Sequence, residues 1–194
     1  LANEHDLPLV PRGGGASYTD GYVPAEENSI LVDTSRMNAI VEINERDMYV
    51  VAQVGVTWAA LNDALAAKGL RTPFFGPFSG IAATIGGGLS QGAVTWGTGV
   101  FGISGENVLG VEVVLGTGEV VRTGSWGAAN SVPFLRLYGP DLTGLFMSDA
   151  GALGIKTTVS MRLMPRREHV LGLSFGFKDF DSMAAGMEAA AREG

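Results

Sequence analysis

The sequence predicts an α+β domain, and three observations lead to that fold class. Runs that read as strands dominate the middle of the chain, while helical segments are few and do not alternate regularly with them. The 194 residues are 46% hydrophobic, enough for about one domain with its own core. The chain also holds 29 glycines, roughly twice the usual share of about 7%. They cluster without a period of three, so they do not indicate collagen.

The expected elements follow the order of the chain. Thr57 is a good N-cap for a helix over 58–68, which Gly69 would end, and a second helix is predicted over 182–193. Residues 1–6 read like the end of a helix. The expected strands, including one hairpin closed by a Gly-Thr-Gly turn, are 8–10, 30–33, 49–54, 108–115 with 119–122, 155–163 and 171–177.

The charge and the cysteine content exclude several classes of function. The net charge of −7 argues against nucleic acid as a partner, because phosphate backbones require a basic face. The absence of cysteine excludes disulfides, zinc–thiolate sites, iron–sulfur clusters and thiol catalysis. His5 and His169 lack neighbouring carboxylates at a ligand spacing, so no metal site is predicted. We expect a cytoplasmic protein, since a chain without cysteine is compatible with a reducing compartment.

A long uncharged stretch lies between Arg71 and Glu106. We do not expect it to span a membrane, because its glycines and prolines leave no window of about 20 apolar residues. A buried, loop-rich segment explains the pattern better. The backbone amides and carbonyls of such a segment need partners, and a large polar ligand is one of them.

Two nucleotide-binding motifs are matched only in part. Residues 97–102 read Gly-x-Gly-x-x-Gly, but we expect neither the preceding strand nor the following helix that a Rossmann turn requires. Residues 151–157 resemble a P-loop, but Ile155 precedes Lys156 where that motif requires glycine. We therefore interpret the first segment as loop turns and the second as the start of a strand.

The first glycine cluster runs from Pro11 to Ser17, between two predicted strands. Its three consecutive glycines allow successive backbone amides to point into one concavity, since φ is free and no Cβ blocks a ligand. Such a nest binds a pyrophosphate with few cations, which suits a segment whose one basic residue is Arg12. A flexible surface turn is the alternative, and this cluster by itself does not decide between the two.

The second glycine cluster covers residues 77–88 and continues to Ala93. Glycines here would allow a flat ring to lie directly against the backbone. Close packing between strands is the alternative explanation.

Four segments, taken in order, resemble the FAD-binding domain of the vanillyl-alcohol oxidase superfamily, also called the p-cresol methylhydroxylase (PCMH) type. They are residues 11–17, the Thr-Ile-Gly-Gly of 84–87 followed by Ala93, residues 111–121 with their Gly-Thr-Gly turn, and residues 138–146 running into Gly-Ala-Leu-Gly-Ile. The match covers nearly the whole chain. It implies the PCMH-type fold, in which two α+β subdomains surround the cofactor.

The resemblance also implies which residues hold FAD. Residues 13–17 would bind the pyrophosphate through backbone amides, residues 84–93 would line the path from the diphosphate to the flavin, and residues 151–155 would close over the cofactor. No catalytic residue is assigned, because in relatives the catalytic groups lie beyond the part that this chain matches. The implied cofactor-binding residues are Arg12, Gly13, Gly14, Gly15, Ala16, Ser17, Pro77, Gly80, Thr84, Gly86, Gly87, Gln91, Ala93, Gly151, Gly154 and Ile155.

The chain departs from the family pattern in two places. Some relatives carry a histidine bonded to the flavin at the position of Ala16, and alanine cannot form that bond, so we expect non-covalent FAD. Many hydroxy-acid relatives have Ser-Glu-Gly where this chain has Asp-Ala-Gly at 149–151. Residues 122–124 and 137–140 look somewhat like the aromatic-alcohol branch instead.

By resemblance, residues 1–36 form a first FAD-binding subdomain, residues 37–168 a second, and residues 169–194 the start of a cap domain, with both ends truncated. The implied enzyme is an FAD-dependent oxidoreductase that oxidises a hydroxyl-bearing carbon and passes electrons to an unidentified acceptor. We expect a small 2-hydroxy acid such as D-lactate or glycolate as the substrate. The alternatives are an aromatic alcohol or phenol, an FAD-dependent transferase like the ether-lipid synthases, and an interaction module without activity. The sequence is also compatible with a homo-oligomer.

Overall fold

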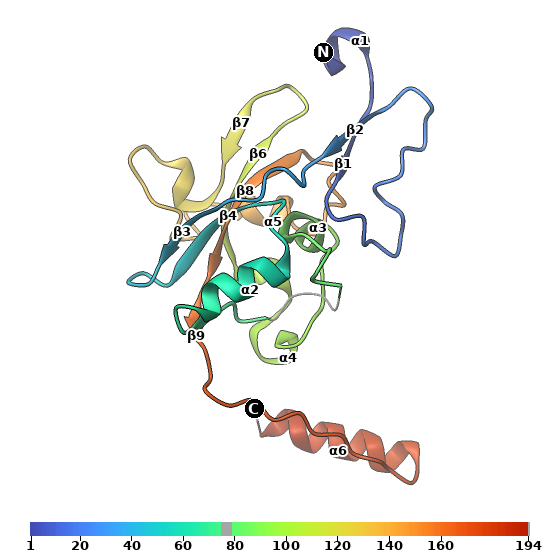
Figure 1. Ribbon diagram of the computed structural model, residues 1–194, viewed down its shortest axis with the longest axis vertical. Helices are drawn as coiled ribbons and strands as arrows, with labels where there is room; N and C mark the ends of the chain where they lie inside the picture. The colour runs from blue at the N-terminus through green and yellow to red at the C-terminus, as the bar shows by residue number, and fades with distance from the viewer. Residues whose placement is uncertain (75–78, 194) are drawn as a thin grey trace.

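The computed structural model describes residues 1–74 and 79–193 and has helices packed against a mainly antiparallel sheet (Figure 1). The α+β class is confirmed. The main sheet has the strand order β3-β4-β8-β6-β7, and each neighbouring pair is antiparallel. Strand β8 therefore lies at the centre of the sheet although it is the last of these strands in the sequence. The bounds are β3 Ile40–Asn44, β4 Tyr49–Gln53, β6 Val108–Val114, β7 Val120–Arg122 and β8 Ile155–Arg162.

Two small sheets accompany the main one. Strands β1 (Leu9–Arg12) and β2 (Ile30–Asp33) pair in parallel, while β5 (Leu70–Arg71) and β9 (Met164–Pro165) pair antiparallel. The amide of Thr34 donates to the last carbonyl of β1 at 2.9 Å. The parallel pairing continues to the last residue of β1, so the first glycine cluster leaves the sheet from a fixed point.

Helix α2 (Trp58–Ala66) begins where the sequence predicts. The Oγ1 atom of Thr57 accepts a hydrogen bond from the amide of Ala60 at 3.2 Å, as an N-cap does. The other helices are short, apart from the last one. They are α1 Ala2–His5, α3 Ile85–Ser90, α4 Thr98–Phe101, α5 Leu142–Leu145 and α6 Phe180–Arg192, with 3-10 turns η1 Ser104–Asn107 and η2 Gly124–Gly127.

The core forms where α2 and α3 pack against the main sheet (Figure 1). Trp58, Leu61 and Leu65 share one face of α2 and are fully buried. The ring of Trp58 meets that of Phe74 edge-on, with the ring centroids 5.1 Å apart. Burying each of these large side chains contributes roughly 1.5–3 kcal/mol. The core therefore fixes α2, and through it the neighbouring α3.

The structure differs from the sequence prediction at several segments. Residues 97–102, interpreted as loop turns, contain the short helix α4. Residues 84–90, expected as loop, form α3 after its cap at Thr84, and strand β3 had not been predicted. The strand expected over 171–177 was wrong: residues 166–179 contain no helix or strand. A strand needs a neighbour to pair with, and within the described residues this segment has none. Its apolar side chains are exposed, and α6 buries no residue and lies apart from the rest (Figure 1).

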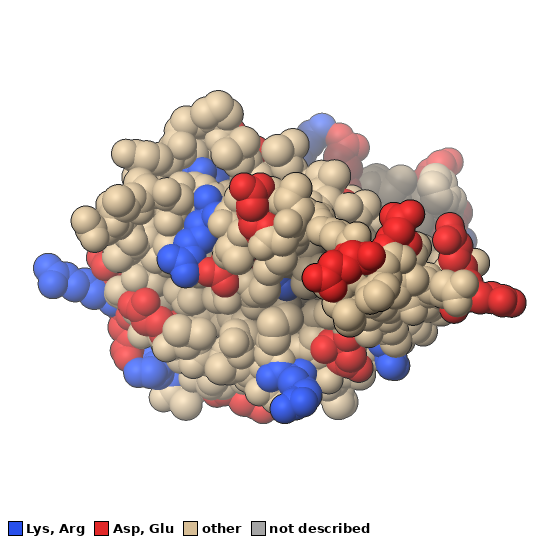
Figure 2. All heavy atoms as spheres, turned by 90° about the horizontal axis from the view of Figure 1, so that it is seen from above, with Lys and Arg blue, Asp and Glu red and all other residues tan. Residues whose placement is uncertain are grey.

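The surface carries mixed charge. On the face seen in Figure 2, Lys and Arg side chains are separated from one another, with Asp and Glu between them. Within the described residues, no helix is both long and apolar enough to cross a membrane.

Candidate functional site

A cavity of about 390 Å³ brings together three segments that are distant in the sequence: residues 11–22 at and after the end of β1, residues 79–94 around α3, and residues 150–156 at the start of β8. Its volume lies within the range of about 300–1,000 Å³ of small-molecule sites. The residues predicted from the sequence that line it are Arg12, Gly13, Gly14, Gly15, Ala16, Ser17, Thr84, Gly86, Gly87, Gln91, Ala93, Gly151, Gly154 and Ile155.

Two predicted residues are not placed in this lining. Gly80 is not one of the lining residues; its carbonyl accepts the amide of Ala59 at 3.0 Å and so braces the first turn of α2. Pro77 lies outside the described residues. The lining residues that the sequence did not predict include Tyr18, Tyr22 and Lys156.

The first wall of the cavity offers a run of unpaired backbone donors. Within the described part of the chain, the amides of residues 13–17 donate no hydrogen bond. The Nε atom of Arg12 is also buried without a partner there. The Arg12 guanidinium lies 5.6 Å from the ring centre of Tyr22 and 3.9 Å from a carboxylate oxygen of Asp33. Residues 13 and 15–17 are half-buried and Gly14 is exposed, so their amides, together with the buried Nε of Arg12, are donors available to the acceptor oxygens of a ligand.

The glycines of this wall serve a different purpose from the one that we expected. A Cβ at Gly13 would lie 2.3 Å from Thr84 Oγ1, and one at Gly14 would lie 1.7 Å from the carbonyl oxygen of Ala82. Missing side chains here let two loops pack together and do not clear space for a ligand. Gly15 has a φ of +66°, which favours glycine for conformational reasons.

Helix α3 forms the second wall and starts at the capping residue Thr84, whose Oγ1 accepts the Gly87 amide at 3.3 Å. A Cβ at Gly86 would strike Val54, and one at Gly88 would strike Trp58. At Gly87, by contrast, a Cβ would meet only Thr84 Oγ1, at 3.3 Å. Two of the glycines thus allow close packing of the helix, while Gly87 faces the cavity.

The third wall is a turn that precedes β8. Ser148, Ala150 and Gly151 all have left-handed φ angles, of 56°, 52° and 81°. The amide of Ser148 donates to the carbonyl of Leu89 and the amide of Ala150 to that of Ser90, both at 2.9 Å. These bonds hold the turn against the C-terminal end of α3.

A buried ion pair lies under this turn. The Nζ atom of Lys156 is 2.6 Å from Asp149 Oδ1 and 2.9 Å from Ser90 Oγ, and both charged side chains are at most 3% exposed. Burial lowers the pKa of Lys156 below its ordinary value, although the hydrogen bond and charge of Asp149 oppose that shift. Lysine in a strand that otherwise enters the core was the sequence signal that we did not use.

The electrostatics of the lining are one-sided. Of the described residues that line the cavity, the charged ones are Arg12 and Lys156, and neither Asp nor Glu is among them. The chain as a whole carries a net charge of −7. Two cations and residues with unpaired amides line one space, and no carboxylate is among its described lining residues, which favours an anionic ligand.

A comparison with protein-family models identifies the family of this chain. A family model described as "FAD binding domain" matches residues 1–124. The chain belongs to this FAD-binding family. The resemblance to PCMH-type domains is thereby confirmed, and FAD is the cofactor of the family.

Individual relatives agree with this assignment. The chain is 34% identical over 185 residues to an uncharacterized FAD-linked oxidoreductase of Mycobacterium tuberculosis, covering 95% of this chain and 38% of that protein. It is 33% identical to glycolate oxidase subunit GlcD of Bacillus subtilis, covering 95% of this chain and 37% of that protein. Thus the chain spans less than two fifths of these relatives.

Solved structures support the fold. The chain matches a structure of alkyldihydroxyacetonephosphate synthase with a TM-score of 0.70 at 22% sequence identity, covering 84% of this chain and 27% of that one. At this identity the likeness concerns the fold.

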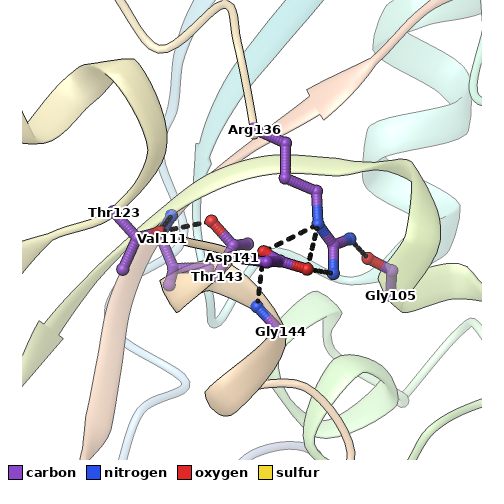
Figure 3. A network of polar contacts seen from close by, with 7 residues as sticks. All are labelled: Gly105, Val111, Thr123, Arg136, Asp141, Thr143 and Gly144. Atoms are coloured by element: carbon purple, nitrogen blue, oxygen red, sulfur yellow. Dashed lines mark hydrogen bonds and ion pairs between the residues drawn. The ribbon is translucent and has the colours of Figure 1, made fainter. Parts of the chain in front are cut away.

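A polar network holds α5, the helix that precedes the turn of the third wall in the sequence (Figure 3). Arg136 holds Asp141 with Nη2 2.9 Å from Oδ2, and donates through Nη1 to the carbonyl of Gly105. Asp141 Oδ1 accepts the Gly144 amide at 3.0 Å and so caps α5. The hydrogen bond from Arg136 lowers the pKa of Asp141, against the opposing effect of burial.

The same network joins α5 to the main sheet (Figure 3). The hydroxyls of Thr123 and Thr143 lie 2.7 Å apart, and the Val111 amide in β6 donates to Thr123 Oγ1 at 3.0 Å. Both threonines are buried. The residues between α5 and β8 therefore approach the cavity from a fixed base.

Proposed function

We propose that the cavity between β1, α3 and the start of β8 holds FAD. The observation that carries this proposal is the run of residues 13–17, whose amides lack partners in the described structure and which line a space whose charged lining residues are cations. A dinucleotide pyrophosphate is the anionic part of FAD, and consecutive amides suit it without many lysines.

The proposed roles follow the three walls. Residues 12–17 would hold the pyrophosphate, with Arg12 as the charged member. Thr84, Gly86, Gly87, Gln91 and Ala93 would line the path towards the flavin, and Gly87 leaves room there because a Cβ at that position would extend into the cavity. Gly151, Gly154 and Ile155 would close the site. Gly80 is left out, because its carbonyl braces α2 outside the lining.

We further propose that the full-length protein is a flavin-dependent oxidoreductase of a 2-hydroxy acid. The similarity to a glycolate oxidase subunit supports this substrate class. When bound, FAD accepts a hydride equivalent from the substrate carbon. The residues of this chain would bind and orient the cofactor and keep water from its buried side, and we assign none of them a catalytic proton transfer.

Two measurements on the full-length protein test these proposals. The purified protein, incubated with FAD, should show a bound-flavin spectrum, and a protein that never retains flavin would contradict the cofactor site. Anaerobic addition of glycolate or D-lactate should bleach that spectrum. Bleaching by aromatic alcohols alone would move the substrate class to phenols and alcohols, and no bleaching with any donor would favour a transferase.

The domain division remains part of the proposal. We propose a first FAD-binding subdomain over residues 1–36, a second over 37–168, and the start of a cap over 169–194. The end of β2, the end of β9 and the separate α6 support these limits. We also retain non-covalent FAD, a cytoplasmic location and homo-oligomer formation as predictions, the first testable by release of FAD on acid precipitation.

A further inference from the structure

We propose that Lys156 is a cofactor-binding residue, and that Asp149 and Ser90 position its ammonium group so that one N–H bond remains for an acceptor oxygen of FAD. This inference rests on the proposed function, since it takes the cavity as the FAD site. It assigns a role to the one buried lysine of the lining, which the implied FAD-binding residues do not include.

The geometry fixes where the ammonium group lies. Lys156 is the second residue of β8, and its Nζ reaches Ser90 Oγ at the end of α3 at 2.9 Å and Asp149 Oδ1 at 2.6 Å. Both Ser90 and Lys156 line the cavity, while Asp149 does not. The carboxylate that holds the ammonium group therefore belongs to a residue outside the lining.

The cluster is incompletely satisfied in the described structure. A lysine ammonium has three N–H donors, and two of them are used by Ser90 and Asp149. Asp149 Oδ2 is also buried without a partner among the described residues, but it is an acceptor and so would not bond a cofactor oxygen. Polar groups left over in a buried network are costly unless something satisfies them. A cofactor oxygen in the cavity would satisfy the remaining donor of Lys156.

A purely structural role is the competing explanation. The pair could serve only to hold the turn of residues 148–151, to which it is also tied by the hydrogen bond from the Gly151 amide to Asp149 Oδ1 at 3.0 Å. A buried ion pair that acts only in this way can often be replaced by neutral side chains of similar volume without loss. A pair whose cation binds the cofactor cannot.

The test therefore compares three variants of the full-length protein: Lys156→Met, Asp149→Asn and the double variant. FAD affinity is measured by titration, and the rise in melting temperature on adding FAD is measured for each. Lys68→Met is the matched control, because Lys68 is partly exposed, pairs with Glu45 and is not a lining residue.

We expect the double variant to keep the melting temperature of the FAD-free protein but to bind FAD about 10- to 100-fold more weakly, as loss of a hydrogen bond from a charged donor predicts. In the two single variants, the rise in melting temperature on adding FAD should change in opposite directions. Asp149→Asn leaves a buried cation that FAD can compensate, so the rise in melting temperature on adding FAD should exceed that of the wild type. Lys156→Met should reduce that rise.

Several results would overturn the inference while leaving the FAD site intact. Wild-type FAD affinity in the double variant would show that the pair only supports the turn. Equal rises in melting temperature for the two single variants would show the same, even if the double variant does not fold. Failure of the wild type to bind FAD would instead contradict the proposed function itself.

Two further measurements, of ADP affinity and of the reduction potential of bound FAD, locate the acceptor oxygen on the cofactor. If Lys156 contacts the diphosphate, the double variant should also lose affinity for ADP and keep the reduction potential of bound FAD. If it contacts the flavin, ADP affinity should stay constant and the potential should fall, because a positive charge near the ring favours the reduced, more anionic form. Unchanged ADP affinity and potential, together with unchanged FAD affinity, would contradict both.

Discussion

Gly14 packs directly against the carbonyl group of Ala82: a Cβ at residue 14 would lie 1.7 Å from that oxygen. The contact joins the loop after β1 to the loop before α3. The Thr34 amide fixes the beginning of the first loop, and the Thr84 cap fixes the end of the second. The unpaired amides of residues 13–17 owe their placement to this contact, so the glycine is needed for the shape of the site before any ligand arrives.

Gly14→Ala should destabilise the protein itself. The added methyl group cannot fit beside the Ala82 carbonyl, so one loop must move, and overpacking of this kind costs roughly 1–3 kcal/mol. Denaturant unfolding without added FAD should show a lower free energy of unfolding. An unchanged value would mean that the two loops separate freely, contrary to the packing described here.

Gly87→Ala should leave the stability of the FAD-free protein unchanged or raise it, and should weaken FAD binding. A Cβ at Gly87 points into the cavity and meets only Thr84 Oγ1, at 3.3 Å. Alanine also favours a helix over glycine by up to about 1 kcal/mol. Stability without FAD should therefore stay constant or rise, while FAD affinity falls by about tenfold or more from the steric conflict.

The control for Gly87→Ala is Gly99→Ala. Gly99 is also helical, in α4, has no atom within 4 Å of the added Cβ and does not line the cavity. Both variants should gain helix stability, but the control should bind FAD like the wild type. Equal FAD affinity for the two variants would place the cofactor away from α3.

How much of this could be foreseen is clearest at the two central helices. Thr57, the apolar spacing after it and Gly69 identify α2, because its capping and its buried face are local properties of the sequence. Helix α3 was missed because its three successive glycines disfavour a helix. Contacts of Gly86 with Val54 and of Gly88 with Trp58, which no local pattern reveals, make glycine the residue that fits there.

The residues of the candidate site also fall into a part that the sequence predicts and a part that it does not. The glycine and threonine positions that line the cavity were predictable from the resemblance, because they belong to short contiguous motifs. The pairing of Lys156 with Asp149 and Ser90 was not, because it depends on the left-handed turn at residues 148–151 and on a strand beside α3. The failed strand over 171–177 shows the converse: a strand-like pattern forms no strand when no partner strand lies beside it.

Gly151→Ala should weaken both stability and FAD binding. Gly151 has a φ of +81°, and a Cβ there would lie 2.7 Å from Pro11 Cγ, at the point where the third wall meets the end of β1. Gly139→Ala is the matched control, because Gly139 has a φ of +88° but open space around the added Cβ. Each variant should lose roughly 1–2 kcal/mol from backbone strain.

Comparing the stability and the FAD affinity of the two variants separates backbone strain from closure of the third wall. Gly151→Ala should lose additional stability from the contact with Pro11 and should also show weaker FAD binding in a titration. Gly139→Ala should bind FAD with wild-type affinity, since Gly139 does not line the cavity. Identical behaviour of the two would mean that backbone strain alone, and not closure of the wall, accounts for the effect.

The Arg136–Asp141 pair should make stability depend on pH on the acid side. The hydrogen bond from Arg136 is the largest cause that lowers the pKa of Asp141 below its ordinary value of 3.8. A carboxyl group whose pKa is lower in the folded state adds stability above its unfolded pKa, and this stability is lost as the pH falls through the folded pKa. We therefore compare the free energies of unfolding of the wild type and Asp141→Asn between about pH 6 and about pH 3. The wild type should be the more stable near pH 6, and the difference in free energy of unfolding should shrink towards pH 3.

Asparagine can still accept the Gly144 amide, so Asp141→Asn retains the cap of α5. In an Arg136→Met background the same comparison should lose most of its pH dependence, and a difference that stayed pH-dependent there would assign the effect to other partners of Asp141.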